Sequence, residues 1–192
     1  TQQRLDGNFY NLRTNVGNST SKGVEGLVEF SPVKFFKINP AFGNIIVFTS
    51  LAYINAKYQN MRVVVKEGNS LVETNLKNKS IENAPEQIYR TGITYSKKEL
   101  TLTVQYSYVS EAFSDANNSK TANSSGVNGP IPAYKLVDVS GTYKFNEKFF
   151  VKAGVNNLMN EKYFTRRASG YPGPGLMPAE PINYFVTVGV KL

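Results

Sequence analysis

The side chains best suited to hold a small ligand lie near the C-terminus, where Arg166 and Arg167 are adjacent and Tyr163 and Tyr171 flank them. A guanidinium presents its N–H donors in a fixed plane that matches the two oxygens of a carboxylate. A tyrosine ring can pack on such a ligand, and its hydroxyl can hydrogen-bond to it. We therefore expect these four residues to contact an anionic ligand, provided that the surrounding elements hold them together.

The composition excludes most catalytic chemistry. The 192 residues include no histidine and no cysteine, which removes most zinc and copper sites, iron–sulfur clusters, disulfides and any nucleophile paired with a histidine. Only three aspartates occur, so a carboxylate metal site would depend almost entirely on glutamate. The sequence contains no G-x-S-x-G, Walker or H-E-x-x-H motif. We expect no enzyme activity, no metal site and no cofactor.

The chain is basic, with 22 Lys and Arg residues against 14 Asp and Glu and a net charge of +8. A nucleic-acid-binding protein gathers such residues on one face. Here they are scattered, and Lys97-Lys98 and Arg166-Arg167 are the only adjacent pairs, so we expect no nucleic acid partner. No apolar run exceeds four residues, whereas a membrane-spanning helix needs about 20.

Apolar and polar residues alternate along several long segments, which predicts strands with one apolar and one polar face. Between residues 100 and 108, for example, the even positions are apolar and the odd positions are polar. We expect about eight strands: a weak one near 8–13, then 22–30, 45–58, 86–96, 99–111, 134–145, 149–158 extending towards Arg166, and 181–192. Segments of about ten or more alternating residues match tilted strands that cross a bilayer.

The connections between these strands are of two kinds. The tight polar turns are 96–98 and 146–148, and the long loops rich in polar, glycine or proline residues are 59–80, 114–132 and 167–181. Bacterial outer-membrane barrels have short periplasmic turns and long outer loops, and tyrosines and phenylalanines near the strand ends fit their interfacial girdles. The predicted fold is therefore an all-β, antiparallel transmembrane β-barrel, although segment 31–44 is longer than a tight turn.

Residues 154–163, Gly-Val-Asn-Asn-Leu-Met-Asn-Glu-Lys-Tyr, resemble the G-V-x-N-L-x-[DN]-x-x-Y element near the C-terminus of TonB-dependent outer-membrane receptors. The glycine- and proline-rich loop 170–175 and the alternating segment up to Leu192 continue the likeness, although the usual terminal residue is Phe. Segments 15–25 and 82–90 resemble earlier strands of the same family. The likeness covers nearly the whole chain and is greatest for the ferric citrate type of transporter.

The resemblance implies a 22-stranded barrel whose lumen is filled by an N-terminal plug domain. Residues 1–192 would be the C-terminal portion of that barrel, without the plug, the segment that contacts the TonB complex or the earlier strands. The implied function is TonB-dependent uptake of a ferric siderophore or iron-citrate-like chelate across the outer membrane of a Gram-negative bacterium. Arg166, Arg167, Tyr163 and Tyr171 would contact the chelate, and Arg90 would face the plug. Lipid and lipopolysaccharide would surround the barrel.

Other interpretations of the same residues stay open. The chain could form a complete eight-stranded outer-membrane barrel with a structural or adhesion role, or a soluble β-sandwich. The two arginines could instead bind lipopolysaccharide or be solvated on a loop. Vitamin B12, nickel complexes and glycans are alternative substrates. The chain begins at Thr1 without a methionine or an export signal, which we interpret as processing or fragmentation.

Overall fold

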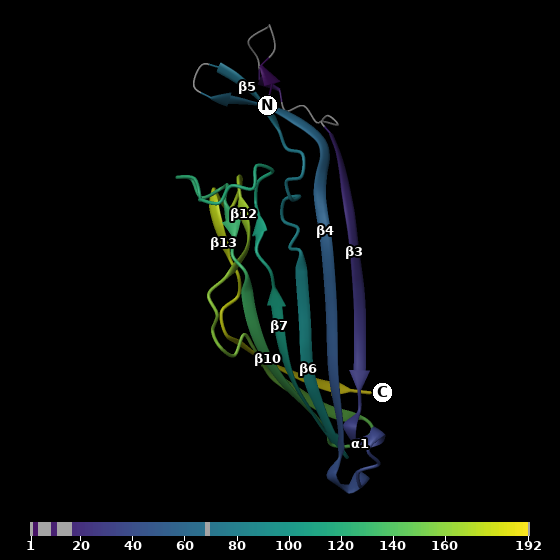
Figure 1. Cartoon of the computed structure of the whole chain (residues 1–192). Helices are drawn as coiled ribbons and strands as arrows, with labels where there is room; N and C mark the ends of the chain where they lie inside the picture. The colour runs from purple at the N-terminus through teal and green to yellow at the C-terminus, as the bar shows by residue number, and fades with distance from the viewer. Residues whose placement is uncertain (1, 4–8, 11–16, 68–69, 192) are drawn as a thin grey trace.

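The protein is built around one antiparallel sheet of long strands (Figure 1). The computed structural model describes residues 2–3, 9–10, 17–67 and 70–191. In spatial order the strands of the sheet are β14 (Asn183–Val190), β11 (Phe149–Asn156), β10 (Tyr134–Lys144), β7 (Leu100–Val109), β6 (Gln87–Lys97), β4 (Asn44–Glu67) and β3 (Gly17–Phe30), and β5 (Ser70–Asn75) pairs with one end of β4. Each strand predicted from position 22 onward overlaps one strand of this sheet.

Tight turns join the strands at one end of the sheet, which we call the turn end. Between β6 and β7 only two residues intervene, and Lys98 there has a positive φ of 49°. In the β10–β11 turn, the side-chain oxygen of Asn146 accepts hydrogen bonds from the backbone N–H groups of Lys148 and Phe149, both at 2.9 Å. This is the local geometry that makes asparagine a turn former. The opposite end, where the long connections lie, is called the loop end.

One predicted loop is wrong, because segment 59–80 contains a hairpin. β4 continues to Glu67 and pairs with β5, with Arg62 opposite Asn75 at the base of the pair. A salt bridge of 3.2 Å joins Arg62 to Glu73 across the two strands. Two strands can pair through their backbone donors and acceptors alone. These strands therefore form although their sequence lacks the alternation of apolar and polar residues that was used to predict strands.

The predicted extension of the 149–158 strand towards Arg166 is also wrong, because β11 ends at Asn156. The next residue, Asn157, has a positive φ of 51°, a conformation that an extended strand does not contain. The chain turns there, and Arg166 lies instead in a separate hairpin of β12 (Phe164–Ala168) and β13 (Gly175–Pro178).

Some predictions fall on parts of the chain outside the described residues. The weak strand expected near 8–13 is one of them, apart from β2 (Phe9–Tyr10), which pairs with β1 (Gln2–Gln3). Leu192 is another. Segment 31–44, which was expected to be longer than a tight turn, connects β3 to β4 and contains the short helix α1 (Pro32–Phe35) and the 3-10 turn η1 (Pro40–Phe42).

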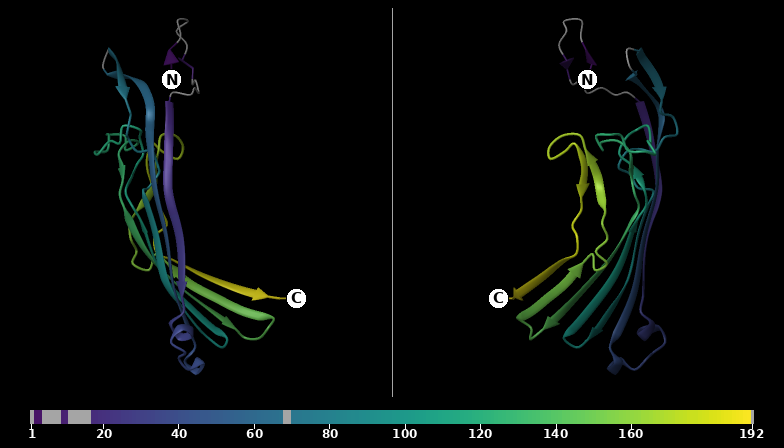
Figure 2. Two further views of the ribbon diagram at one scale, coloured as in Figure 1. Left: turned by 45° about the vertical axis from the view of Figure 1, so that its right-hand side comes forward. Right: turned by 90° about the vertical axis from the view of Figure 1, so that its left-hand side faces the viewer.

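The sheet is a single curved layer with two free edges (Figure 2). β3 and β14 form these edges, and within the described residues they do not pair with each other. A complete eight-stranded barrel would need its last strand to pair with its first. The described part of the chain is therefore a section of barrel wall.

One face of this wall carries an almost unbroken apolar surface. A single row across the strands runs Phe30, Val47, Ile93, Val104, Val139, Val155 and Tyr184. Many side chains of this face are open rather than packed: within the row, Ile93 is 52% exposed, Val104 48% and Tyr184 73%. The buried apolar residues among those described are few, namely Val33, Ala56, Leu76, Ala112 and Ile131.

The exposed apolar face decides between a membrane barrel and a soluble sandwich. In a sandwich, the apolar side chains of one sheet are covered by those of a second sheet about 10 Å away. Here no second large sheet covers the apolar rows in the described residues. An exposed apolar band of this extent requires another apolar environment, which the acyl chains of a bilayer supply.

The opposite face of the wall is polar. One row near the turn end reads Asn44, Ser96, Thr101, Thr142, Lys152 and Thr187. In the next row the hydroxyl oxygens of Thr94 and Thr103 are 3.1 Å apart and share a hydrogen bond. This face suits an aqueous or protein-filled lumen, as the alternation in the sequence predicts.

Three phenylalanines also lie on the polar face, and each covers a glycine directly opposite on the neighbouring strand. The pairs are Phe48 with Gly92, Phe185 with Gly154, and Phe150 with Gly189. A Cβ atom added to any of these glycines would clash with the ring of its partner. The rings therefore lie flat against the sheet where the neighbouring strand has no side chain, an arrangement known to stabilise glycine positions in strands.

Candidate functional site

The candidate site lies at the loop end of the polar face, where several connections converge. The β12–β13 hairpin stands beside the short pair of β8 (Ala112–Phe113) and β9 (Pro130–Ile131) (Figure 1). Residues 114–129 of the predicted 114–132 loop link β8 to β9. The predicted ligand residues Tyr163, Arg166, Arg167 and Tyr171 all belong to the hairpin or its approaches.

Tyr163 packs on the wall itself. Its ring stacks on the ring of Tyr134, with centroids 4.5 Å apart and an interplanar angle of 30°. Tyr134 is the first residue of β10 and lies on the polar face. Burial raises the pKa of Tyr163, and the charges of Tyr134, Glu180 and Asp138 raise it further. The phenol is therefore neutral at physiological pH and presents an aromatic surface with one O–H donor.

Asn157 holds the chain between β11 and the hairpin. It is only 3% exposed, and its backbone N–H donates to Oδ1 of Asp138 at 2.9 Å. Its side-chain NH₂ donates to the carbonyls of Glu161 at 2.9 Å and Glu180 at 3.3 Å, while its Oδ1 accepts from the N–H of Glu161 at 2.8 Å. These bonds fix the turn of the G-V-N-N-L segment and so determine where Tyr163 and the hairpin stand.

Arg167 connects the hairpin to the 114–132 loop. Its Nε and one terminal nitrogen donate to the carbonyl of Pro130 at 3.1 and 2.7 Å, and the other terminal nitrogen donates to the carbonyl of Gly126 at 2.8 Å. Its guanidinium also lies 5.1 Å from the centre of the Phe164 ring. Most of its hydrogen-bonding capacity is thus used inside the protein.

Arg166 and Tyr171 are more open to a ligand. Arg166 is exposed, and its Nε lies 2.9 Å from Sδ of Met177 on the neighbouring strand. Tyr171, at the tip of the hairpin, is fully exposed. The structure therefore places the four predicted residues on one hairpin without bringing their side chains to one point, and their contact with a ligand stays a prediction.

The 114–132 loop is ordered by its own polar residues. Asp115 accepts hydrogen bonds from the N–H and hydroxyl of Ser119 and from the N–H of Gly129. The side chain of Asn118 bonds to both the N–H and the carbonyl of Ser80, at 2.7 and 2.8 Å. The loop is consequently attached to the β5–β6 connection as well as to the hairpin.

Arg90 lies on the polar face of β6, in register with Ser50 and Ser107. This is the side on which its predicted contact with a plug would have to occur, and that contact stays a prediction. Tyr134 and Asp138 were not predicted to belong to the site. The available signal was weak: Tyr134 is an aromatic residue at a polar position of the alternating pattern, a feature that only the fold connects to Tyr163.

The described residues contain no group of three or more acidic side chains that could hold a metal ion. Among the helices of the described structure, none has the length and hydropathy that a membrane crossing requires. The residues of the site described above offer stacking surfaces, guanidinium donors and backbone groups for recognition.

Comparisons with known proteins agree with this architecture. The family model described as "TonB dependent receptor-like, beta-barrel" matches residues 1–158. The vitamin B12 transporter BtuB of Vibrio cholerae is 25% identical over 175 residues, which are 91% of this chain and 24% of that protein. The chain therefore spans about a quarter of the length of the curated relatives that it matches.

Two solved structures share the fold. The ferric citrate transporter FecA in its unliganded form matches with a TM-score of 0.75 and 19% identity, over 91% of this chain and 24% of that one. The siderophore receptor PiuA from Acinetobacter baumannii matches with a TM-score of 0.66 and 19% identity, over 92% of this chain and 22% of that one.

The family comprises outer-membrane receptors and transporters of Gram-negative bacteria rather than enzymes. The lipid-facing apolar band, the polar inner face and the long connections at one end are the features expected of its barrel wall. Together with the match over residues 1–158, they show that this chain belongs to the TonB-dependent receptor family and represents part of its β-barrel.

Proposed function

We propose that residues 1–192 form the C-terminal portion of a 22-stranded barrel that surrounds a plug domain. The open sheet supports this placement, because in the part of the chain that the structure describes both β3 and β14 have a free edge on which further barrel strands can pair. The match to about a quarter of the length of related receptors is in keeping with it. In this arrangement, the polar face of the sheet, including Arg90, looks towards the plug.

The complete receptor, in this proposal, takes up a ferric chelate through the outer membrane with energy delivered by the TonB complex. The single observation that carries the proposal is the two-faced wall, apolar outside and polar inside, with the hairpin and the 114–132 loop joined at its loop end. These segments form part of the vestibule in which a ligand from outside first binds. The neighbours FecA and PiuA are named for ferric citrate and siderophores, which supports an iron chelate.

Within the vestibule, Arg166 is the residue best placed to contact an anionic chelate. It is exposed and retains free guanidinium donors, whereas those of Arg167 are largely used by Pro130 and Gly126. Tyr171 at the hairpin tip and Tyr163 at its base supply aromatic surfaces. A chelate with carboxylates or catecholates would use the charge of Arg166 in a way that a neutral ligand would not.

The test is binding of defined ligands to the full-length receptor in detergent, followed by uptake in iron-starved cells that lack other receptors. We expect saturable binding of ferric citrate or a ferric siderophore, and uptake that stops when TonB is deleted while binding persists. Arg166→Gln should weaken binding by roughly 10- to 100-fold, the equivalent of one charge-assisted hydrogen bond. Lys77→Gln, which removes an exposed charge from the β5–β6 connection, is the matched control.

A corrin is the second candidate ligand, because the curated relative of Vibrio cholerae is a vitamin B12 transporter. Cyanocobalamin belongs in the same binding experiment. Tight binding of cyanocobalamin, without binding of any iron chelate, would replace the ferric ligand in this proposal and leave the barrel placement intact.

A further inference from the structure

The connection between β3 and β4 differs from the other turns at its end of the sheet. It spans residues 31–43 and contains α1 and η1, whereas two residues suffice between β6 and β7. In α1 the Oγ of Ser31 accepts a hydrogen bond from the N–H of Lys34, and its side chain also donates to Asn44 at 2.9 Å. The connection is therefore a small folded unit at the turn end (Figure 1).

This unit lies against the lipid-facing side of the wall. The ring of Phe35 is 5.4 Å from that of Phe30, which belongs to the apolar face of β3. At the other end of the unit, the hydroxyl of Tyr95, also on the apolar face, donates to the carbonyl of Phe42 at 3.0 Å. These two contacts attach the connection to the lipid-facing side of the wall, and the hydrogen bond from Ser31 to Asn44 of the polar face holds it across the end of the sheet.

Gly43 permits the second of these contacts. It has a φ of 94°, and a Cβ there would lie 2.8 Å from both the carbonyl oxygen of Ser96 and a ring atom of Tyr95. Only glycine allows the backbone to approach Tyr95 so closely in this conformation.

Large aromatic side chains of the unit remain uncovered. Phe35 is 70% exposed, Phe36 65% and Phe42 70%. The rings of Phe35 and Phe36 contact each other edge to face, with centroids 5.0 Å apart. In a membrane barrel, exposed aromatic rings at the end of the apolar band belong at the boundary between headgroups and acyl chains.

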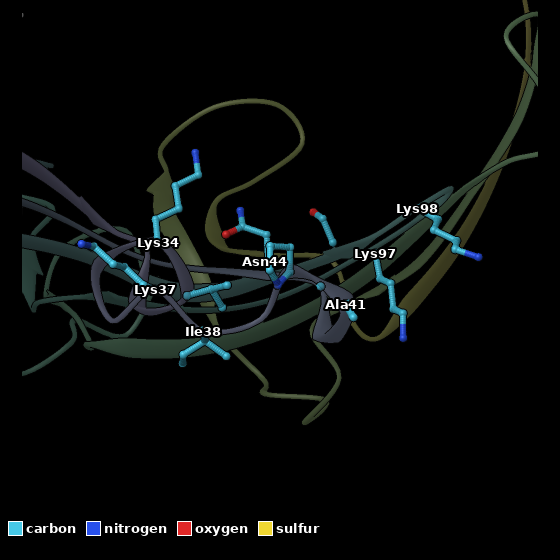
Figure 3. A pocket seen from close by; sticks show the side chains of 11 residues that line it. Lys34, Lys37, Ile38, Ala41, Asn44, Lys97 and Lys98 are labelled. Carbon is cyan, nitrogen blue, oxygen red and sulfur yellow. The ribbon is translucent and has the colours of Figure 1, made fainter.

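Beside these rings is a basic hollow of about 640 Å³. Four lysines line it, Lys34 and Lys37 from the connection and Lys97 and Lys98 from the end of β6 and the turn after it. Asn44 and Ser96 of the polar face also line it, so the hollow lies at the end of the wall, between its two faces. Figure 3 shows the two lysine pairs on opposite sides of the hollow. Within the described part of the chain none of the four forms a salt bridge, and Glu99 is the acidic residue next to them in sequence.

We propose that this hollow binds the headgroup of an anionic phospholipid in the inner leaflet of the outer membrane. The lysine ammonium groups contact its phosphate, and Phe35, Phe36 and Phe42 lie among the neighbouring acyl chains. Basic pockets at a membrane surface recognise anionic headgroups in this way. The proposal rests on the proposed placement in an outer-membrane barrel, because short turns of such barrels lie on the periplasmic side, where the leaflet consists of phospholipid.

The first experiment measures lipid retention by the full-length receptor. Purified receptor in detergent is mixed with phosphatidylglycerol or phosphatidylcholine, and bound lipid is counted by native mass spectrometry. The test variant carries Lys34→Gln, Lys37→Gln, Lys97→Gln and Lys98→Gln. The matched control removes the same charge at the loop end with Lys77→Gln, Lys79→Gln, Lys120→Gln and Lys135→Gln.

We expect the wild type and the control to retain phosphatidylglycerol at least about tenfold more than phosphatidylcholine, the factor that roughly 1.4 kcal/mol of headgroup preference supplies. The test variant should lose that preference. If both variants lost the preference for phosphatidylglycerol equally, the preference would come from overall charge and not from the hollow. If the test variant kept the preference, the proposed site would be refuted. The eight substituted lysines are all exposed, and heat-modifiable migration in gels verifies that each variant barrel is folded.

A second experiment locates the connection in the bilayer. A spin label at Phe36→Cys in the receptor, reconstituted in phosphatidylglycerol-containing vesicles, should be more accessible to oxygen than to a water-soluble nickel complex. The reverse preference would place Phe36 in water, and shielding from both reagents would indicate a protein partner; either result overturns the proposal. Neither readout uses the chelate, so lipid retention without chelate binding would refute the transport function alone.

Discussion

Replacing Val104 with arginine in the full-length receptor should strongly weaken its folding into the membrane. Val104 lies in the middle of β7 on the apolar face, and its cross-strand neighbours are Ile93 and Val139. Its side chain is 48% exposed, so an arginine there would meet acyl chains. An arginine or lysine on the lipid face at the bilayer midplane costs about 2–4 kcal/mol, which is roughly a 30- to 700-fold change in the folding equilibrium.

Two substitutions on the same strand provide the controls. Gln105→Arg places the charge on the polar face, directly opposite Asp138, and should change stability by less than about 1 kcal/mol. Tyr108→Arg remains on the apolar face but lies four residues nearer the loop end. Four residues are about 14 Å along a strand, or about 10 Å along the membrane normal at the usual tilt, where the cost falls to about 0–1 kcal/mol.

The assay is urea unfolding of the receptor in lipid vesicles, followed by the heat-modifiable mobility of the folded barrel. Val104→Arg should be the most destabilising of the three, and Tyr108→Arg and Gln105→Arg should each cost less than about 1 kcal/mol. If Gln105→Arg were the most damaging and Val104→Arg harmless, the apolar rows would not face lipid, and the assignment of inner and outer surfaces would be refuted.

Two further predictions concern the loop end. Asn157→Ala removes three side-chain hydrogen bonds from a buried position with positive φ. It should therefore lower the free energy of unfolding by about 3 kcal/mol. Met159→Ala, at an exposed position, is the control, and an unchanged urea midpoint for Asn157→Ala would contradict the prediction. Tyr58 lies on β4, five residues beyond Tyr53. Burial and the hydrogen bond to Glu82 raise the pKa of Tyr58 to about 12. The neutral phenol is thus favoured in the folded state, so its contribution to stability is complete below pH 10 and is lost as the pH rises through about 12. The difference in free energy of unfolding between the wild type and Tyr58→Phe, measured at increasing alkaline pH, should show this loss. A difference that stays constant with pH would exclude it.

Much of the wall could be predicted because its determinant is local. In a membrane barrel, each strand meets lipid on one side and a polar interior on the other, so alternation within one strand, as between Leu100 and Tyr108, is sufficient to identify it. The β4–β5 hairpin was missed for the same reason. Beyond the bilayer both faces of a strand meet water, and the pattern that marks a strand disappears although its backbone pairing remains.

The turn after β11 illustrates a second limit. The resemblance identified the segment 154–163 but not what Asn157 does in it. Its hydrogen-bond partners Glu161 and Glu180 lie 4 and 23 residues away. The distant partner becomes a neighbour only after β14 has paired with β11. Short-range patterns predict strands, whereas this turn depends on contacts that the completed sheet creates.

The two arginines show why a site is harder to predict than a strand. Adjacent in sequence, they suggest a pair of guanidinium groups directed at one ligand. Both, however, lie within β12, opposite Met177 and Leu176, and successive residues of a strand point to opposite faces. Arg167 accordingly reaches the carbonyls of Pro130 and Gly126 and orders the loop, while Arg166 stays exposed. Secondary structure therefore gives two identical neighbours different surroundings: Arg167 is bound to the loop, and Arg166 is the one that we propose contacts a ligand.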